Sequence, residues 1–422
     1  MTIDQRSRPQ PDSSALLPAP ATVVPIASRT PSGDGGVAGR PARGLRVLTF
    51  LHSFEPGGVE RIALRMVRQW RRTGVDAPLF LGREDGALRT ELAQDLDYEV
   101  ARQPRVSTAG WETLWMILQL PGVIRRLRPD VLFVAGSTYT IVAVMMRLLL
   151  GRDCPPIVTK ISNDLARRDL PPVARAGWRL WLWLQARLIH RWVLMDESMA
   201  PEMPRAMAAR SLVVHDPALD RRSDPAPRLR EAVAGRRFVA VGRLVHQKDF
   251  SLMLRGFAAG ARADDTLTIY GDGPERAQLA ALAERLALTA RVTFAGHVPD
   301  AASRLGDYDV LLMSSRYEGI PAVLLEALDA GLAVISTDCG AGVRSLLGQG
   351  RFGRVVARSD AAFAAAIAEA VPTPAPAAEL DAHLARFTVD RAAAGYFAAF
   401  VDAAHGDRAT APLPIAPMPR AA

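Results

Sequence analysis

Short apolar runs alternate with longer segments of helical periodicity along most of this 422-residue chain. The run Leu45–His52 (LRVLTFLH) is followed by Val59–Arg72, where Ile62, Met66 and Trp70 recur at helical spacing. Such alternation is typical of a doubly wound sheet, in which helices connect parallel strands. Further strands of the first half are predicted at Pro78–Leu81, Val131–Ala135, Ile157–Ile161, Trp192–Met195 and Leu212–Val214, with helices at Trp111–Arg128 and Tyr139–Leu150.

A second alternation follows a link rich in proline and arginine, Asp216–Arg230. Its predicted strands are Phe238–Val241, Leu267–Tyr270, Val292–Ala295, Val310–Met313, Val334–Thr337 and Arg354–Val356. A chain of this length exceeds one ordinary core. We therefore predict an α/β protein of two Rossmann-like, doubly wound domains that face a central cleft. The predicted segments are a disordered tail (1–44), an N-terminal domain (45–218), a linker (219–234), a C-terminal domain (235–388), a helix (389–405) and a disordered tail (406–422).

Cysteine content and hydropathy predict the compartment. The two cysteines, Cys154 and Cys339, argue against a disulfide scaffold and favour a reducing environment. No apolar run reaches the roughly 18–20 residues that span a bilayer, and prolines interrupt the apolar N-terminal stretch where a signal peptide would lie. We therefore expect a cytoplasmic protein.

The net charge of +8 is unevenly distributed. Residues 45–220 contain 24 basic and 19 acidic side chains, whereas residues 221–422 contain 23 and 22. This excess suggests that the first half faces an anionic partner. A nucleic-acid partner is disfavoured, because no aromatic residues interleave a basic run.

The stretch Met313–Ala330 (MSSRYEGIPAVLLEALDA) follows a predicted buried strand and opens into an apolar helix. Glu318 lies in the loop after the strand and Glu326 lies inside the helix. Ligands of doubly wound sheets bind at this carboxyl edge, so both carboxylates can face one crevice. The alternative is a glutamate favoured by the helix dipole together with a solvated one.

Other strand ends carry residues suited to a phosphorylated ligand. Arg243 and Lys248 follow the first strand of the second half, where two cations can neutralise a diphosphate. Gly271 follows the next strand, in Gly-Asp-Gly-Pro, but Arg276 stands where a dinucleotide fingerprint needs its third glycine. In the first half, Gly57-Gly58 permits close backbone approach at a helix N-terminus, although such a turn is often only a tight connection.

Four segments, VGRLVHQKDF, TIYGDGPE, VTFAGHV and SSRYEGIPAVLLEALDAG, in this order and spacing resemble the retaining glycosyltransferase family 4, whose fold is GT-B. GGVER at Gly57–Arg61 resembles the N-terminal glycine loop of that family. The resemblance is dense over 235–356 and thinner over 45–220. It implies an acceptor domain at 45–218 and a nucleotide-sugar donor domain at 235–388.

By that resemblance, Arg243 and Lys248 hold and stabilise the departing diphosphate, and Glu318 contacts the transferred sugar. Glu326 accepts hydrogen bonds from the ribose hydroxyls. The resemblance further implies that Gly319 and Ile320 offer backbone groups and that Val298 lies on the loop near the base. It also implies a metal-independent reaction without a cofactor, with the nucleotide sugar as substrate.

The segment Gly177–Trp192 (GWRLWLWLQARLIHRW) combines four tryptophans with arginines. Such residues suit a membrane interface, although a core helix with snorkelling arginines is the alternative. With the basic first half, this segment predicts an anionic membrane surface as a partner, at the cytoplasmic face. The predicted activity is transfer of a sugar to a lipid-linked or polysaccharide acceptor. A GT-B enzyme acting on a small soluble acceptor and a non-catalytic nucleotide-sugar-binding subunit are the alternatives.

Overall fold

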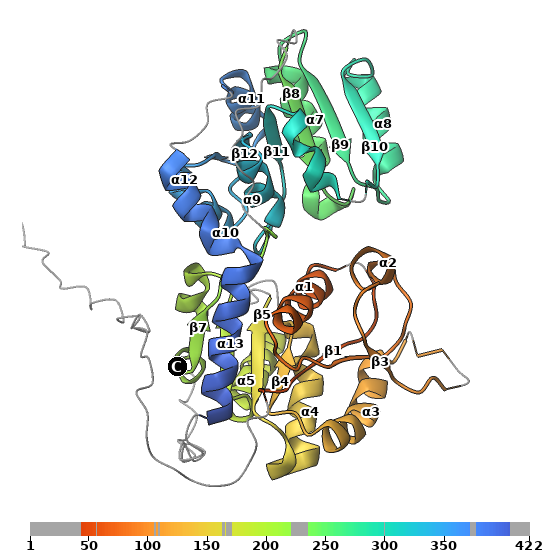
Figure 1. The fold of residues 1–422 in the computed structure, drawn as a ribbon. Helices are drawn as coiled ribbons and strands as arrows, with labels where there is room; N and C mark the ends of the chain where they lie inside the picture. The colour runs from red at the N-terminus through yellow and green to blue at the C-terminus, as the bar shows by residue number, and fades with distance from the viewer. Residues whose placement is uncertain are drawn as a thin grey trace, which may run out of the picture. The chain divides into compact units, whose positions relative to one another are not determined.

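The computed structural model describes residues 44–405 except 56, 105–106, 109, 163–164, 166–170, 221–234, 299 and 372–376. The predicted tails, apart from Gly44, and most of the predicted linker lie outside the described residues. Two parallel sheets form the framework (Figure 1), as the sequence predicted.

The first sheet has seven strands in the order β3-β2-β1-β4-β5-β6-β7. All of its pairings are parallel, with Thr49 opposite Leu79 and Val47 opposite Val131. The short edge strand β3 was not predicted, because two residues carry no periodic pattern. The strands are β1 (Val47–Leu51), β2 (Leu79–Leu81), β3 (Glu99–Val100), β4 (Val131–Val134), β5 (Ile157–Ile161), β6 (Arg191–Leu194) and β7 (Ser211–Val213). The helices are α1 (Gly58–Arg72), α2 (Leu88–Leu92), α3 (Glu112–Leu127), α4 (Thr140–Leu150), α5 (Pro172–Leu188) and α6 (Arg205–Ala208), with short 3-10 turns η1 (Ser137–Tyr139), η2 (Gly151–Asp153) and η3 (Glu197–Glu202).

The second sheet has six parallel strands in the order β10-β9-β8-β11-β12-β13. Its strands are β8 (Arg237–Val241), β9 (Thr266–Tyr270), β10 (Val292–Gly296), β11 (Val310–Met313), β12 (Ala333–Thr337) and β13 (Arg354–Val356). Its helices are α7 (Phe250–Gly260), α8 (Arg276–Arg285), α9 (Ala322–Asp329), α10 (Ala341–Leu346), α11 (Asp360–Ala368) and α12 (Ala377–Leu384), with 3-10 turns η4 (His246–Lys248), η5 (Ala301–Asp307), η6 (Gly348–Gly350) and η7 (Ala385–Phe387). In both sheets the order reverses beside the first strand, which places a topological switch point at the carboxyl ends of β1 and β8.

The central strands are apolar without alternation because helices cover both faces of each sheet. All five residues of β1 and all four of β4 and β11 are buried. Crossovers between parallel strands are right-handed, so reversal of the strand order puts α1 on one face of the first sheet and α3, α4 and α5 on the other. Contacts support this layering, since α4 packs against α3 and α5 (Figure 1).

The last helix, α13 (Val389–His405), joins the core of the first sheet (Figure 1). It packs against α1 and against β4, β5 and β6. Its Phe400 ring meets Trp70 and Phe133 edge-on at 4.9 and 5.6 Å. The two ends of the described chain are therefore parts of one hydrophobic core.

The four tryptophans of Gly177–Trp192 do not lie on one surface. Trp192 lies in β6 and is buried, and Trp178 and Trp181 pack partly buried against the core, whereas Trp183 is exposed. Trp192 therefore cannot belong to an exposed interface, because the predicted strand turns it into the sheet, and only Trp183 of the four is exposed. Among the described residues, no helix is both long enough and apolar enough to cross a membrane.

Candidate functional site

A partly buried ion pair at the carboxyl edge of the second sheet joins two predicted site residues. Lys248 ends turn η4 after β8, and Glu318 lies in the loop between β11 and α9. The Lys248 Nζ lies 2.6 Å from Oε1 of Glu318, and both side chains are largely shielded from water. The structure therefore brings these two residues together although 70 positions separate them in the sequence.

Hydroxyl groups that the sequence analysis did not single out fix this pair. Ser315 donates to the same Glu318 oxygen at 2.7 Å, and Ser314 donates to the backbone carbonyl of Lys248 at 2.9 Å. Thr337, at the end of β12, donates to the carbonyl of Ser315 at 2.7 Å. These buried hydroxyls tie the ends of β8, β11 and β12 into one rigid edge, and the Ser-Ser pair directly after a buried strand was the available signal.

Arg243 lies at the same edge but is arranged differently. Its side chain is exposed, and among the residues that the structure describes it has no ion-pair partner. Gly271 stands beside it with φ +144°, and a Cβ there would come within 1.9 Å of the Gly242 carbonyl oxygen. Only glycine permits this approach, so Gly271 has a packing role in bringing the ends of β8 and β9 together.

Glu326 occupies the middle of α9, on a face that is partly withdrawn from water. Burial raises the pKa of its carboxyl above the ordinary range, and the positive charges of Arg65 and Arg61 on α1 oppose that rise. Glu326 is thus a carboxylate whose ionised form is poorly solvated and is suited to accepting hydrogen bonds from a ligand.

The other predicted donor-side residues lie on neighbouring loops of the second sheet. Gly319 is exposed and Ile320 is half-buried just before α9, while Val298 packs half-buried after β10. Gly342 at the start of α10 lets the chain pass close to the Gly319 carbonyl, where a Cβ would come within 2.2 Å. The structure therefore places Gly319 where the loops after β11 and β12 meet.

The carboxyl edge of the first sheet holds a second group of polar side chains. Gly57 is the N-cap of α1 and Gly58 is its first residue. Glu60, in the first turn, accepts a 2.6 Å hydrogen bond from the Tyr139 hydroxyl.

His52, directly after β1, lies with its ring centroid 4.7 Å from that of Tyr139, and its Nε2 is buried without a hydrogen-bond partner. Burial, assisted by the Arg83 charge, lowers the pKa of His52 to about 4. His52 is therefore neutral near pH 7 and able to bond a hydroxyl group. The sequence analysis regarded it as structural, and its position at the end of the first strand was the signal that it missed.

Lys160 forms the other lysine–carboxylate pair of the molecule's described part, near the end of β5. Its side chain on β5 is buried, and Nζ lies 2.6 Å from Oδ1 of Asp216. Asp216 belongs to the segment that leaves the first sheet, so this pair anchors the start of the link. Asn163, three positions further along the chain, lies outside the described residues.

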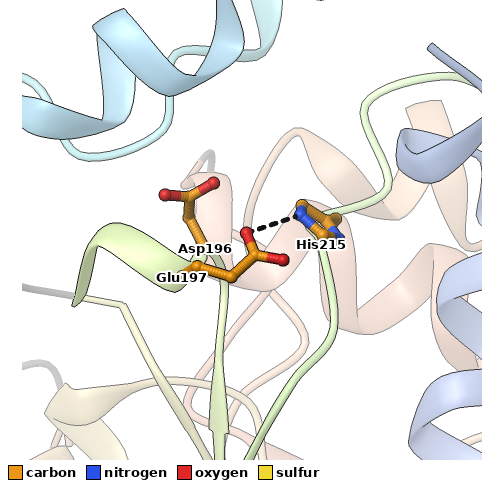
Figure 2. Close-up of side chains that lie close together, drawn as sticks. All are labelled: Asp196, Glu197 and His215. Carbon is orange, nitrogen blue, oxygen red and sulfur yellow. Dashed lines mark hydrogen bonds and ion pairs between the residues drawn. The ribbon is translucent and has the colours of Figure 1, made fainter. Parts of the chain in front are cut away.

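Asp196, Glu197 and His215 form a cluster with metal-ligand chemistry (Figure 2). Glu197 Oε2 lies 3.2 Å from His215 Nε2, while the Asp196 carboxylate points away from the histidine. The Arg386 guanidinium lies 2.6 Å from the same histidine nitrogen and 3.3 Å from the Glu197 carboxylate. The hydrogen bond from His215, together with Arg386, lowers the pKa of Glu197 to about 2.

Ser345 donates to Asp196 at 2.6 Å, so both carboxylates have protein partners. Because Arg386 already supplies the positive charge next to the histidine, the cluster does not fit a metal ion. Its residues and their partners come from the start of η3, the segment after β7, α10 and η7, and it connects those elements.

The arrangement at the second sheet suits a ligand with adjacent negative charge and hydroxyl groups. A lysine and an exposed arginine can meet phosphate oxygens, while Glu318 and Glu326 can accept hydrogen bonds from hydroxyls. The first sheet offers a neutral histidine and a tyrosine–glutamate pair at the corresponding edge. The combined chemistry is that of a transfer reaction with an anionic leaving group.

Two family models match the chain. "Glycosyltransferase Family 4" matches residues 56–215 and "Glycosyl transferases group 1" matches residues 235–372. A GDP-mannose-dependent alpha-mannosyltransferase of Mycobacterium tuberculosis is 30% identical over 339 residues, which cover 74% of this chain and 83% of the relative.

Other curated relatives match over shorter stretches. The N-acetylgalactosamine-N,N'-diacetylbacillosaminyl-diphospho-undecaprenol 4-alpha-N-acetylgalactosaminyltransferase of Campylobacter jejuni is 32% identical over 118 residues, which cover 28% of this chain and 32% of the relative. The chain spans about a third of the length of the first curated relatives it matches. The crystal structure of Anabaena Alr3699/HepE in complex with UDP and glucose superposes with a TM-score of 0.68 at 19% identity, covering 85% of this chain and all of that one. That likeness shows a shared GT-B fold.

Proposed function

Because the chain belongs to glycosyltransferase family 4, we propose that it is a retaining enzyme that moves a sugar from a nucleotide-sugar donor to a lipid-linked or polysaccharide acceptor. The observation that carries the proposal is the Lys248–Glu318 pair, held by Ser315 at the strand end that also presents the exposed Arg243. Two cations and a carboxylate at one carboxyl edge suit a diphosphate that is bound to a sugar.

The chemistry follows from the charges that develop when the donor breaks. As the bond between the sugar and the diphosphate lengthens, negative charge grows on the leaving group and positive charge grows on the sugar carbon. Arg243 and Lys248 stabilise the former, and the Glu318 carboxylate lies beside Lys248, where the sugar would sit. Fixed charges of this kind act without reorganisation in the transition state. These two cations take the place of a metal ion, so the proposed reaction is metal-independent and uses no cofactor.

The rest of the donor site is assigned by the same logic. Glu326 accepts hydrogen bonds from the ribose hydroxyls, and binding them compensates for the poor solvation that raises the pKa of its carboxyl. Gly319 and Ile320 offer backbone groups to the sugar and the phosphates. Val298 lies on the loop after β10 that borders the base, while Gly271 shapes the floor between β8 and β9.

The acceptor is proposed to meet the first sheet. Gly57 and Gly58 leave room at the N-terminus of α1, and His52, Tyr139 and Glu60 offer hydrogen-bonding groups at the same edge. A lipid-linked acceptor is supported by the C. jejuni relative, whose name specifies a diphospho-undecaprenol substrate. We propose that transfer takes place at the cytoplasmic face of the membrane, with the protein bound there peripherally.

Incubation with a panel of UDP-, GDP- and ADP-sugars tests the proposal. We expect nucleotide release with one donor class, unchanged by a metal chelator, and a product whose anomeric configuration matches that of the donor. An inverted product would overturn the retaining assignment, and loss of activity with chelator would overturn the metal-independent one. Donor binding without transfer to any lipid-linked, polysaccharide or small acceptor would instead favour a non-catalytic subunit.

A further inference from the structure

Large apolar side chains are exposed together on one helical layer of the first sheet. Of the twelve exposed large apolar side chains among the described residues, eight lie on α3, α4 and α5. They are Leu114 and Leu118 on α3, Ile141, Leu148 and Leu149 on α4, and Val173, Leu180 and Trp183 on α5. We call this set the α3–α5 face. Its concentration on one layer distinguishes it from the scattered apolar residues of an ordinary surface.

The spacing of these residues makes each helix apolar on two sides. On α3, Leu114 and Leu118 are four residues apart, while Met116 and Leu120 point into the core. On α5, Leu180 and Trp183 repeat at helical spacing and face outward, opposite the buried Leu182. Because α4 packs against both α3 and α5, the helices that carry these side chains are neighbours in one layer.

The charge on these helices is almost entirely positive. The only acidic residue within α3, α4 and α5 is Glu112, and an ion pair with Arg83 neutralises it. The basic residues on the same helices are Arg125, Arg126, Arg147, Arg175, Arg179 and Arg187. The Arg187 guanidinium lies 4.2 Å from the centre of the Trp183 ring, so an aromatic side chain and a cation are presented together.

Apolar side chains flanked by arginines match the interface of an anionic bilayer. The apolar groups gain by leaving water for the acyl boundary, while the guanidinium groups stay at the level of the negatively charged headgroups. A water-exposed face of this kind on a soluble partner-free protein would be a liability for aggregation. The excess of basic over acidic residues on these helices favours an anionic lipid surface over an apolar protein groove.

We propose that the α3–α5 face docks on an anionic lipid bilayer, with Leu180 and Trp183 entering the interface. The inference rests on the proposed function, because a bilayer is the source of a lipid-linked acceptor. It also differs from an interface formed by the whole segment Gly177–Trp192. Trp192 belongs to the core, and α3 and α4 carry five of the eight exposed side chains.

Vesicle flotation of the full chain tests the apolar part. The wild-type protein is compared with Leu180→Gln/Trp183→Gln and with a matched control, Phe397→Gln/Val401→Gln, which removes two similarly exposed apolar side chains from α13. With vesicles of phosphatidylcholine and phosphatidylglycerol, we expect the α5 variant to partition on the order of tenfold more weakly. The α13 variant should partition like the wild type.

Charge reversal tests the electrostatic part. Arg179→Glu/Arg187→Glu is compared with Arg72→Glu/Arg391→Glu, which changes the net charge equally through exposed residues of α1 and α13. Each basic residue near an anionic surface contributes a factor of about five to partitioning, so the first variant should lose binding and the second should keep most of it. Binding should weaken as salt rises, and phosphatidylcholine alone should bind poorly.

Two results would overturn the docking surface. One is equal vesicle binding by Leu180→Gln/Trp183→Gln and by its control, Phe397→Gln/Val401→Gln. The other is a wild-type dimer that does not bind vesicles and that Leu180→Gln/Trp183→Gln dissociates, which would make the face a contact between two copies. Nucleotide affinity distinguishes this inference from the proposed function. A variant that is defective only in docking, such as Leu180→Gln/Trp183→Gln, should bind the nucleotide as the wild type does. Failure of every nucleotide sugar to bind, with vesicle binding intact, would remove the proposed function instead.

Discussion

Lys248 and Arg243 have different tasks although they share one edge of the second sheet. Lys248 is held by Glu318 at 2.6 Å before any ligand arrives, whereas Arg243 is exposed and free to close over phosphate oxygens. A diphosphate would therefore meet one positioned cation and one adaptable cation. In the proposed reaction, both would act on charge that develops in the transition state.

We expect Lys248→Ala or Arg243→Ala to lower the rate of transfer by about 10²–10³, the usual effect of losing one electrostatic group in an active site. The measurement is nucleotide release at saturating donor, with folding monitored by circular dichroism. Arg255→Ala is the matched control, since it removes a cation from an exposed surface pair with Asp360 on the same half. Near-normal turnover in both site variants would show that the reaction centre lies elsewhere.

Glu326 should affect both nucleotide affinity and the pH dependence of the free energy of unfolding, and the two effects can be measured separately. Replacing it with Gln should weaken nucleotide binding on the order of tenfold, because a charged acceptor is lost. The folded state keeps the Glu326 proton to a higher pH than the unfolded chain does, since burial raises its pKa. Over the window from the ordinary carboxyl range up to that raised value, the unfolded chain binds fewer protons, so the free energy of unfolding falls as pH rises.

Glu326→Gln should remove this pH-dependent fall while it weakens binding, as calorimetric titration and denaturation at several pH values can show. Glu284→Gln, which changes an exposed carboxylate on α8, should alter neither property. Unchanged nucleotide affinity would exclude Glu326 from the donor site.

At the scale of single elements, β5 begins at a hydrogen bond that depends on a neutral histidine. His190, between α5 and β6, accepts a 3.0 Å hydrogen bond from the Ile157 amide through Nδ1. Burial, with the charges of nearby arginines, lowers the pKa of His190 to about 4. Protonation would destroy the acceptor and introduce an unpaired positive charge beside other cations.

The consequence is a loss of stability in mild acid. Between about pH 6.5 and about pH 4 the unfolded chain binds more protons than the folded one, so the free energy of unfolding should fall as pH falls. One such proton gives a slope of at most about 1.4 kcal/mol per pH unit. His190→Gln should flatten this slope in urea titrations, while His405→Gln, at the exposed end of α13, should not. Parallel slopes for wild type and His190→Gln would contradict the assignment.

At the scale of the whole molecule, the C-terminal helix α13 packs into the core of the first sheet. Trp70 donates to the carbonyl of Ala393 at 3.3 Å across 323 positions, and Tyr396 and Phe400 complete an aromatic cluster with Trp70 and Phe133. The core of the first sheet is therefore incomplete until the C-terminal helix has been made.

Phe400→Ala should cost about 3–5 kcal/mol, as expected for removing a fully buried aromatic side chain. The effect can be assigned to the first half because all seven tryptophans lie between residues 70 and 192, so intrinsic fluorescence reports on that half alone. Phe397→Ala on the same helix removes a partly exposed ring and should cost far less. Equal costs for the two variants would show that α13 is dispensable for that core.

The sequence by itself determined what local pattern can specify. Buried parallel strands read as continuous apolar runs, so the strands of both sheets were predicted close to their observed bounds, except the two-residue β3. The same locality placed Glu318 in the loop after β11 and Glu326 inside α9, since a strand, a Pro-containing turn and an apolar helix follow one another within twenty residues.

Tertiary structure decided which side chains meet. The partnership of Lys248 with Glu318, the burial of Lys160 against Asp216 and the return of α13 to the first sheet all join residues far apart in the chain. No periodic pattern encodes such partners, because each is selected by packing and by the need to pair a buried charge. The tryptophans are a further example. Trp183 is exposed on helix α5, whereas Trp192 is buried in strand β6.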